Sequence, residues 1–428
     1  MVRKRVSGEG VGVVEVGKTQ AVAAAEGAAG DAGGVARARL PLLDVLRGVA
    51  ILGTLMSNVW IFAGPGAEWG VLSGNTGISA GADLTSLAGM AETVFQSLAN
   101  GKFLSMLTIL FGVGLAIQFR SAAKRGQPWP GRYKWRALFL FAEGTVHFVF
   151  VFAWDVLMGY AVVALLVAWL LTRSARAQRV TWIAMGGLHL AAMTLLTAAT
   201  LLAPGGKTGD GAGSGAGSGP DASTVKLYAE GGYTEQIAFR LSHALALRME
   251  PVLSFALLVF LFLLGVRLFR AGAFQGDEAG RRIRRRLAGW GLGIGLPLTT
   301  LTVLGGSDFF LLERYGAAPV LAIGYLGLIG MVMDRLRHPG PLASAVTSAL
   351  TSVGRTALSC YVLQNVLAML ACYGIGLGLA SRWADNGPWW VMGLWAAICL
   401  VLVTGASLWL RRFEHGPLES VQKRLLRR

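Results

Sequence analysis

Long apolar runs, separated by short polar segments, recur along the chain from residue 43 onward. About ten of them have the roughly 17–25 residues that a helix needs to cross the hydrocarbon core of a bilayer. The pattern therefore predicts an all-α, polytopic integral membrane protein with about ten transmembrane helices. We expect these helices at 43–63, 103–119, 135–153, 156–171, 180–202, 252–268, 287–304, 317–333, 358–379 and 389–410.

The positions of the basic residues predict how these helices are oriented. Of the 39 Lys and Arg, 30 lie in alternate polar segments, namely the residues before 42, 120–136, 173–179, 267–286, 335–337 and 411–428. Such alternation is typical of cytoplasmic loops, so we expect both termini in the cytoplasm. The protein is then a multi-pass protein of the cell inner (plasma) membrane, and the lipid bilayer is its first partner.

Composition and charge support the same class. Hydrophobic residues make up 54% of the chain and charged residues only 14%, against about 25% charged residues in a typical soluble domain. The net charge of +16 follows from membrane topology and an anionic inner leaflet, so it requires no nucleic-acid partner. The sequence does not predict an oligomeric state.

Four regions are predicted from the distribution of apolar and flexible segments. Residues 1–39 are expected to form a disordered basic cytoplasmic tail, and 40–203 an N-terminal bundle of the first five spans. Residues 204–249 combine an extracytoplasmic Gly/Ser linker with an interfacial helix on the outer surface. Residues 250–428 then form a C-terminal bundle of the last five spans.

The first predicted span carries a polar stripe. Asp44, Arg47, Thr54 and Asn58 fall within an arc of roughly 80° on one helical face. An ionised group at the centre of a span costs about 2.5–3.5 kcal/mol, so such groups normally face protein or water. The stripe is either a salt bridge at the helix end or part of a polar path through the protein.

The third predicted span places two ionisable groups near mid-depth. Glu143 and His147 are four residues apart and therefore share a face, and Asp155 follows in the outer turn. A carboxylate beside an imidazole can support a general base or a proton relay. The alternative is a buried hydrogen-bonded pair that ties helices together.

The ninth span and its flanks contain further polar groups. It begins next to Arg355 and carries Tyr361, Gln364 and Asn365 on one face, where they either line a cavity or bond neighbouring helices. Glu313 and Arg314 are expected to be ordinary charges of an outer loop. The chain has no phosphate-binding loop, HExxH motif or Cys–His cluster, so we expect no metal site and no bound cofactor.

A series of short motifs resembles one known family. They are Leu-Asp-Val-Leu-Arg-Gly from Leu43 with Asn58, Lys-Phe-Leu-Ser from Lys102, Gly-Thr-Val-His ending at His147, Gly-Arg-Thr-Ala-Leu-Ser-Cys-Tyr from Gly354, Tyr-Gly-Ile-Gly from Tyr373, and Gly-Pro-Leu-Glu ending at Glu419. In this order they resemble the YeiB-type bacterial membrane family, domain of unknown function number 418. The resemblance covers about residues 40–426.

The first-span pattern is also distantly similar to transmembrane acyltransferases of the heparan-α-glucosaminide N-acetyltransferase type. That similarity implies transfer of an acyl group from cytosolic acyl-CoA, as co-substrate, to an extracytoplasmic acceptor. Those enzymes carry a catalytic histidine soon after the asparagine, whereas 59–100 of this chain contains none. In that stretch the acids or bases are Glu68, Asp83 and Glu92, and His147 is the candidate replacement from another helix.

Three hypotheses follow. In a transmembrane acyltransferase, Arg47 and Arg355 bind the anionic groups of acyl-CoA, Asn58 positions the acyl carbonyl, and His147 with Glu143 acts as base. Asp44, Tyr361, Gln364 and Asp155 are expected to complete its substrate-binding set. In a permease or export-associated transporter, Glu143 and His147 form a proton relay. In a non-catalytic scaffold, the same polar groups only fix helix packing.

Overall fold

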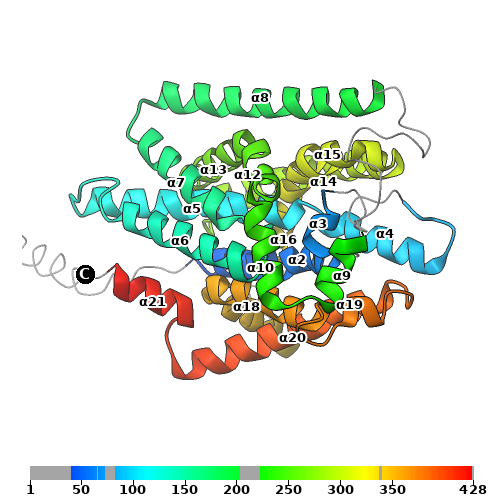
Figure 1. Cartoon of the computed structure of the whole chain (residues 1–428). Coiled ribbons are helices and arrows are strands. Elements are labelled where there is room, and N and C mark those ends of the chain that lie inside the picture. The colour runs from blue at the N-terminus through cyan, green and yellow to red at the C-terminus, as the bar shows by residue number, and fades with distance from the viewer. Residues whose placement is uncertain (1–39, 65, 73–81, 203–221, 337–339, 427–428) are drawn as a thin grey trace, which may run out of the picture. The chain divides into compact units, whose positions relative to one another are not determined.

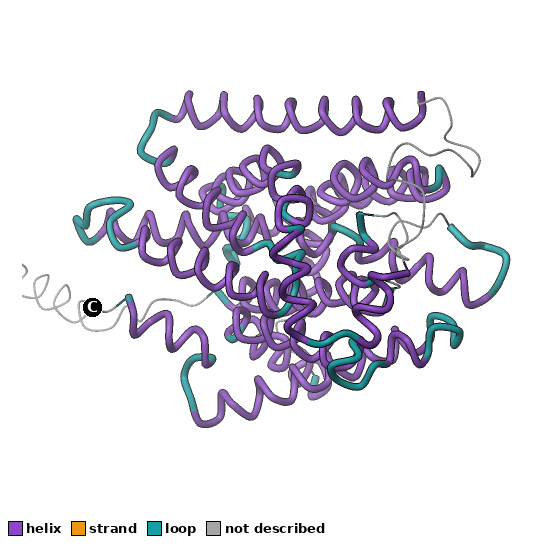
Figure 2. Tube along the Cα trace, in the orientation of Figure 1, coloured by secondary structure: helices purple, strands orange, loops and turns teal. Residues whose placement is uncertain are grey.

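The computed structural model describes residues 40–64, 66–72, 82–202, 222–336 and 340–426. Regular structure in these residues is entirely helical (Figure 2). The predicted tail at 1–39 and the predicted linker at 204–220 lie outside the described residues. The all-α prediction is therefore confirmed for the described part of the chain.

The longer helices coincide with the predicted spans. They are α2 (Pro41–Ala63), α5 (Lys102–Lys124), α6 (Tyr133–Phe150), α7 (Leu157–Leu170), α8 (Ala175–Leu202), α13 (Phe255–Arg270), α14 (Glu278–Leu304), α16 (Ala318–Arg335), α18 (Ala357–Cys372) and α20 (Trp389–Arg412).

Shorter or amphipathic helices connect them. They are α3 (Ala67–Gly70), α4 (Leu87–Ala99), α9 (Ala222–Glu230), α10 (Tyr233–Ser242), α11 (Ala244–Leu247), α12 (Met249–Leu253), α15 (Phe310–Leu312), α17 (Pro341–Arg355), α19 (Leu379–Arg382) and α21 (Pro417–Leu425), with the 3-10 turn η1 (Ser307–Phe309) and the π-helical turn η2 (Glu313–Ala317).

Six helical segments of the described chain are long and apolar enough to cross a membrane by themselves. They are Pro41–Ala63, Leu87–Lys124, Ala175–Leu202, Glu278–Leu304, Ser307–Arg335 and Trp389–Arg412. The bent pair α17 and α18 gives a seventh when it is counted as one span. By contrast, α7 has 14 residues and α13 has 16, which is short for an independent crossing.

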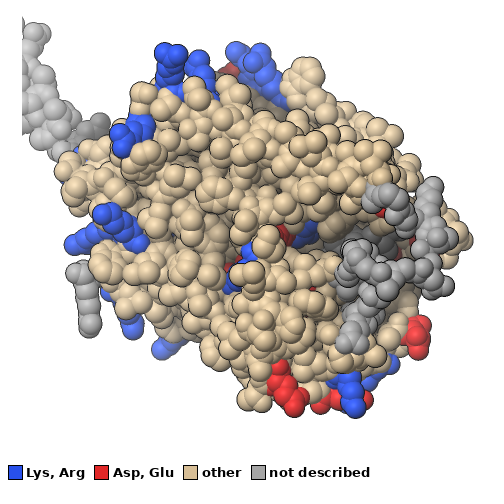
Figure 3. Space-filling view, turned by 45° about the horizontal axis from the view of Figure 1, so that its top comes forward, with Lys and Arg blue, Asp and Glu red and all other residues tan. Residues whose placement is uncertain are grey.

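The peripheral helices expose apolar side chains, whereas α2 is buried among other helices. Leu195 on α8, Leu301 on α14 and Leu400 on α20 are 65–70% exposed, and 72% of the apolar window of α2 is buried. Figure 1 shows α8 and α20 on opposite sides of α2. In Figure 3 uncharged residues form most of the visible surface. A lipid environment would cover such a surface without the cost that water imposes.

The connections lie at two ends of the helices. In Figure 1 the connection from α5 to α6, the turn from α7 to α8, and α21 lie at the left end. The helices α4 and α19 lie at the right end. The first group belongs to the basic segments of the sequence and the second to the segments poor in Lys and Arg.

The unit Pro41–Arg428 brings together helices from both halves of the sequence. Helix α2 packs against α5, α17, α18 and α20, and α5 packs along α13. The side chains on α2 can therefore meet groups that lie about 300 positions later in the chain, as the bond between Asn58 and Asn365 shows.

Two glycines allow α2 and α17 to touch through their backbones. A Cβ on Gly354 would lie 1.8 Å from the carbonyl oxygen of Asp44, and a Cβ on Gly48 would lie 2.1 Å from that of Leu350. Neither contact can be relieved by turning a side chain, because the opposing atoms belong to the backbone.

We expect Gly354→Ala to destabilise the protein by about 1–3 kcal/mol, since the added methyl group must push α17 away from α2. The measurement is thermal unfolding of the purified protein in detergent. Gly405→Ala on α20 is the control, because no described atom lies within 4 Å of its Cβ position. Gly405→Ala should stabilise the protein by up to ~1 kcal/mol, because Ala favours a helix more than Gly does. Equal effects of both substitutions would contradict the close contact.

Helices α17 and α18 meet at an angle of 89° around Thr356. The sequence predicted a span from 358 to 379, whereas α18 ends at Cys372 and an unpredicted helix, α17, precedes it. The free amides at the start of α18 are satisfied by Glu419 of α21, which accepts from the backbone nitrogens of Leu358 at 2.8 Å and Ser359 at 3.2 Å. A carboxylate from a distant helix thus caps the break.

Two expectations for the outer segments are corrected by the structure. The single interfacial helix expected before 249 is divided into α9, α10 and α11, and Arg240 on α10 is fully buried. Glu313 and Arg314 are not ordinary loop charges. Glu313 bonds buried Lys102, and Arg314 bonds Glu250 at 2.9 Å. Burial of both charges is possible because each has an opposite partner.

Candidate functional site

The amino-terminal end of α2 opens into a cavity of about 250 Å³ with a cationic lining. Its arginines are Arg47 from α2, Arg136 from α6 and Arg355 from α17, and its acid is Glu419. We call this cavity the cationic pocket. Arg47 is held by Asp44, whose Oδ1 lies 3.0 Å from its Nη1. The three guanidinium groups exceed the two carboxylates, Glu419 and Asp44, which favours an anionic ligand.

A hydrogen-bonded chain crosses from α2 to α6 through α18. The side-chain nitrogen of Asn58 donates to Oδ1 of Asn365 at 3.3 Å. The side-chain nitrogen of Asn365 lies 3.0 Å from Nε2 of His147 and can donate to it. In that arrangement Nε2 is the unprotonated nitrogen of the ring, as a general base requires.

His147 is almost completely buried between an acid and an aromatic ring. Its Nδ1 lies 3.9 Å from Oε1 of Glu143. The ring of Tyr361 stacks on the imidazole with centroids 5.4 Å apart. The distance to Glu143 exceeds that of a hydrogen bond, and Nδ1 of His147 has no other hydrogen-bond partner among the described residues. The predicted pairing of Glu143 with His147 is thus a close approach and not a direct bond.

Tyr361 links this histidine to both the cationic pocket and the turn after α6. Its ring lines the cationic pocket, and its hydroxyl donates to Oδ1 of Asp155 at 3.2 Å. The backbone nitrogen of Leu157 donates to the other oxygen of Asp155 at 3.0 Å. Arg248 donates to the backbone oxygen of Asp155 at 2.9 Å and fixes the turn. Burial raises the pKa of Asp155 to about 7, although Arg248 acts in the opposite direction.

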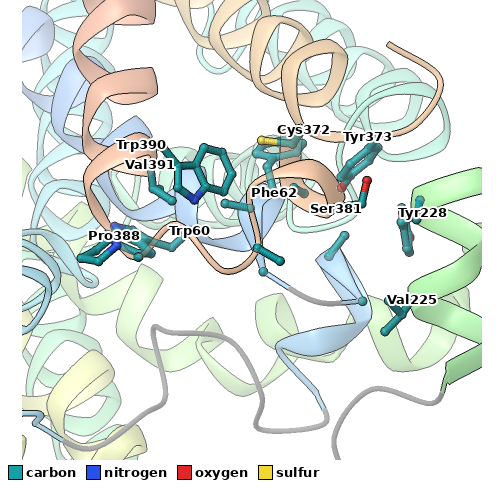
Figure 4. Close-up of a pocket in the computed structure, with 18 of the residues that line it drawn as sticks. Trp60, Phe62, Val225, Tyr228, Cys372, Tyr373, Ser381, Pro388, Trp390 and Val391 are labelled. Carbon is teal, nitrogen blue, oxygen red and sulfur yellow. The ribbon is translucent and has the colours of Figure 1, made fainter. Parts of the chain in front are cut away.

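A second cavity, of about 450 Å³, lies at the other end of α2 (Figure 4). Trp60 and Phe62 of α2, Tyr228 of α9, Tyr373 after α18 and Trp390 of α20 contribute its rings. We call it the aromatic pocket. Arg47 and Trp60 are 13 positions apart on α2, which corresponds to about 20 Å along the axis. The chain of Asn58, Asn365 and His147 starts between these two positions.

The structure brings most of the predicted site residues together. Asn58, His147, Tyr361 and Asp155 belong to one connected cluster, with Glu143 beside it, and Arg47 and Arg355 line the adjoining cationic pocket. Asp44 and Gln364 are placed differently, because Asp44 only supports Arg47 and Gln364 makes no hydrogen bond to the cluster. Gln364 is fully buried, and neither polar atom of its side chain has a partner among the described residues.

Sequence reasoning missed three residues of this cluster as site residues. Asn365 connects Asn58 to His147, and its position on the polar face of the ninth span was the available signal. Arg136 was assigned only to a basic flank, and Arg248 only to an outer loop. Their roles depend on contacts between helices that no local pattern contains.

The three acids near the first span, where the histidine is missing from 59–100, each have other partners. Glu68 is buried in an ion pair with Arg240 at 2.8 Å. Asp83 bonds Thr85, and this hydrogen bond lowers the pKa of its carboxyl. Glu92 bonds Gln96 at the rim of the aromatic pocket. His147, by contrast, shares the partner Asn365 with Asn58.

Comparison with known proteins connects this cluster to a family. The family model described as "Protein of unknown function (DUF418)" matches residues 268–428. The carboxyl-terminal part of the chain is therefore similar to this family. Arg355, Tyr361 and Asn365 lie in the matched region, whereas Arg47 and His147 precede it.

Two relatives are similar over nearly the whole chain. The uncharacterized protein YeiB of Escherichia coli (strain K12) is 28% identical over 399 residues, covering 90% of this chain and 95% of YeiB. The uncharacterized protein YxaH of Bacillus subtilis (strain 168) is 25% identical over 393 residues, covering 89% of this chain and 92% of YxaH. The similarity therefore includes both parts of the residue cluster. In the described part of the chain, no three His, Cys, Asp or Glu residues are grouped as metal ligands would be.

Proposed function

We propose that this protein is a transmembrane acyltransferase that moves an acyl group from cytosolic acyl-CoA to an extracytoplasmic acceptor. The observation that carries the proposal is the position of His147. It lies beside Tyr361, which lines the cationic pocket, and it is joined by hydrogen bonds to α2, whose other end lines the aromatic pocket. A base between an anion-binding cavity and a second cavity suits a group transfer across the bilayer.

The proposed orientation places the cationic pocket on the cytoplasmic side. It includes about ten spans, both termini in the cytoplasm, and the inner membrane as location. Two observations support it: the basic connections from α5 to α6 and from α7 to α8 lie with α21 at one end of the helices, and each predicted span overlaps a helix. Acyl-CoA would then reach Arg47 directly from the cytosol.

The chemistry can be assigned to atoms of the cluster. The phosphates of acyl-CoA bind Arg47, Arg136 and Arg355. Nε2 of His147 exchanges its hydrogen bond from Asn365 for one from an acceptor hydroxyl or amine. It then takes that proton while the acceptor atom attacks the thioester carbonyl carbon. The carbon–sulfur bond breaks, and the proton passes from His147 to the leaving thiolate, which gives the acylated acceptor and free CoA.

Other side chains support this step. The amide nitrogen of Asn58 can donate to the acyl carbonyl oxygen, where negative charge develops. Glu143 faces Nδ1 of His147 and stabilises the imidazolium that forms when Nε2 takes the proton. Tyr361 holds the plane of the imidazole through ring stacking.

The proposal predicts that acetyl-CoA stabilises the purified protein against heating. A ligand that binds only the folded state adds ~2.7 kcal/mol at 100 times its dissociation constant. Arg47→Ala should abolish this stabilisation, since the mutation removes a phosphate-binding cation from the pocket. The measurement is a thermal unfolding scan in detergent with and without acetyl-CoA and longer acyl-CoAs.

Arg412→Ala is the matched control, because Arg412 is exposed at the end of α20 and is not part of the cationic pocket. This variant should keep the full response to acetyl-CoA. Absence of stabilisation by every acyl-CoA in the folded wild-type protein would overturn the proposed function.

One observation favours the permease alternative. The helix break of 89° between α17 and α18 lies next to the polar cluster, and broken helices are common at transporter binding sites. In that case, purified protein in liposomes would carry a proton flux that Glu143→Gln abolishes, without any effect of acyl-CoA. An acyltransferase would instead carry no such proton flux and would respond to acyl-CoA.

A further inference from the structure

Helix α21 presents one side to the protein and an apolar side to its surroundings. Glu419 and Gln422 lie one helical turn apart and both line the cationic pocket. Pro417, Val421 and Leu425 follow one another at intervals of four residues on another side. On that side Val421 is 46% exposed and Leu425 is 58% exposed. The helix is therefore amphipathic, and its apolar side has no cover from the described chain.

Two basic side chains lie on the remaining surface of α21. Lys423 and Arg424 are exposed, and within the described residues neither of them forms an ion pair with a carboxylate. The acid of this helix, Glu419, is turned inward, where it accepts from the backbone nitrogens of Leu358 and Ser359. The outward charge of α21 is therefore positive.

The end of α20 sets the level at which α21 lies. Helix α20 is long and apolar enough to cross a bilayer, and it ends at Arg412, five positions before α21 begins. Leu408 on α20 and Phe413 just after it are 59% and 46% exposed. Figure 1 shows α21 at the same end of the helices as the basic connections. An amphipathic helix at this level lies in the membrane interface, with its apolar side in the acyl boundary and its cations among the headgroups.

We propose that α21 docks on anionic phospholipid headgroups at the membrane surface and that this contact stabilises one wall of the cationic pocket. Charge complementarity selects the headgroup, because two cations without an acidic partner attract phosphatidylglycerol more strongly than zwitterionic phosphatidylcholine. The apolar side of α21 supplies the part of the contact that does not depend on charge.

The contact reaches the pocket through Glu419. Its Oε1 accepts from the backbone nitrogens of Leu358 at 2.8 Å and Ser359 at 3.2 Å, and its Oε2 accepts from the hydroxyl of Ser359 at 2.5 Å. The backbone nitrogen of Leu418 donates to the same hydroxyl at 3.0 Å. These bonds join α21 to the first turn of α18, where Leu358 lines the cationic pocket. A docked α21 therefore holds this wall in place, and the consequence for acyl-CoA binding rests on the proposed function.

The small size of the apolar side argues against a second copy of the chain as its occupant. A helix of nine residues is about 14 Å long, whereas a stable protein–protein interface buries about 800 Å² on each partner. Val421 and Leu425 together are too small for such an interface. A soluble acidic partner would neutralise the cations but leave the apolar side in water.

Hydrogen exchange of the full-length protein in lipid nanodiscs tests the proposal. One set of nanodiscs contains phosphatidylcholine alone, and the other contains phosphatidylcholine mixed with phosphatidylglycerol. We expect the amides of α21, and those of Leu358 and Ser359, to exchange about 5- to 30-fold more slowly with phosphatidylglycerol, because each cation near an anionic surface contributes about 5-fold. A high salt concentration should remove this difference, since salt screens the headgroup charge.

Variants on the outward sides of α21 locate the contact. The double variant Lys423→Gln with Arg424→Gln should lose the slowing caused by phosphatidylglycerol. Leu425→Gln should speed the exchange of α21 by about 3- to 10-fold in both kinds of nanodisc, because it removes apolar surface from the acyl boundary. Arg176→Gln with Arg179→Gln is the matched control, since it removes two exposed arginines from another helix, α8. This control should keep the full slowing.

Each other outcome contradicts a stated part of the proposal. Equal exchange of α21 in the two kinds of nanodisc would overturn lipid docking, as would a slowing that persists in the folded Lys423 and Arg424 double variant or is lost in the α8 control. Inorganic phosphate that slows exchange equally in phosphatidylcholine nanodiscs would show a site for a free anion instead of a membrane contact. Slower exchange of α21 without any change at Leu358 and Ser359 would overturn the stabilisation of the pocket wall. None of these measurements contains acyl-CoA, so their failure is separate from a failure of the proposed function.

Discussion

Replacing His147 with Gln is expected to lower the rate of acyl transfer by about 10²–10⁴-fold. Glutamine can still bond Asn365, but it cannot take a proton from the acceptor at neutral pH. The measurement is release of free CoA thiol from acetyl-CoA by inverted membrane vesicles, which expose the cytoplasmic face and retain native envelope components as acceptors.

His415→Gln is the control for this prediction, because His415 lies next to α21 and its side chain is 36% exposed. That variant should retain the wild-type rate. A folded His147→Gln protein that transfers acyl groups at nearly the wild-type rate would show that the base is another residue. Glu143→Gln should give a smaller loss, since Glu143 acts through His147.

Replacing Glu68 with Ala is expected to destabilise the protein by about 3–5 kcal/mol. Both side chains of the ion pair with Arg240 are fully buried, and their closest atoms are 2.8 Å apart. Glu68 also accepts from the hydroxyl of Tyr228 and from the backbone nitrogen of Ala153. Removing the carboxylate would leave the Arg240 charge buried without its partner. Burial lowers the pKa of Arg240, and the carboxylate of Glu68 raises it by a larger amount. The net shift of the Arg240 pKa is therefore upward, and the guanidinium stays charged.

An exposed ion pair of equal length provides the control. Arg281 and Glu278 on α14 also approach to 2.8 Å, but their side chains are 25% and 55% exposed. Glu278→Ala should therefore change stability by less than ~1 kcal/mol. Both variants are compared by thermal unfolding in one detergent. If the Glu68 variant were no less stable than the Glu278 variant, the buried pair would contribute no net stability.

Removing both charges of the buried pair tests whether an unpaired charge causes the loss of stability. The double variant Glu68→Gln with Arg240→Met should regain most of the lost stability, because no unpaired charge remains. A double variant as unstable as Glu68→Ala would show that the unpaired charge is not the cause of the loss.

The helices were predictable because their signal is local. Each predicted span is an apolar run of helix length, and each coincides with a helix such as α2 or α16. The bend at Thr356 was not predictable from the same signal. The residues around it, Val353 to Leu358, contain neither Pro nor a polar run. The bend is stabilised by Glu419, which lies about sixty positions away and caps α18.

The candidate site was predicted as separate pieces. Asn58, His147 and Tyr361 were each chosen because a polar group inside an apolar run is costly unless it has a partner or a function. Their common neighbourhood was not predictable, since spacing along one helix says nothing about which helix lies opposite. The link through Asn365 joins residues 218 and 307 positions apart in sequence.

The sequence alone determined the helical class, the positions of the apolar helices, and which few polar residues lie within them, because these depend on local composition and helical periodicity. Tertiary structure decided that Glu313 and Arg314 are buried with partners, that α17 precedes a sharp bend, and that two pockets lie at opposite ends of α2. The reason is physical: a charge is stable in a protein interior only if an opposite charge meets it there. Which charges are paired in this way depends on how helices that are distant in sequence pack together.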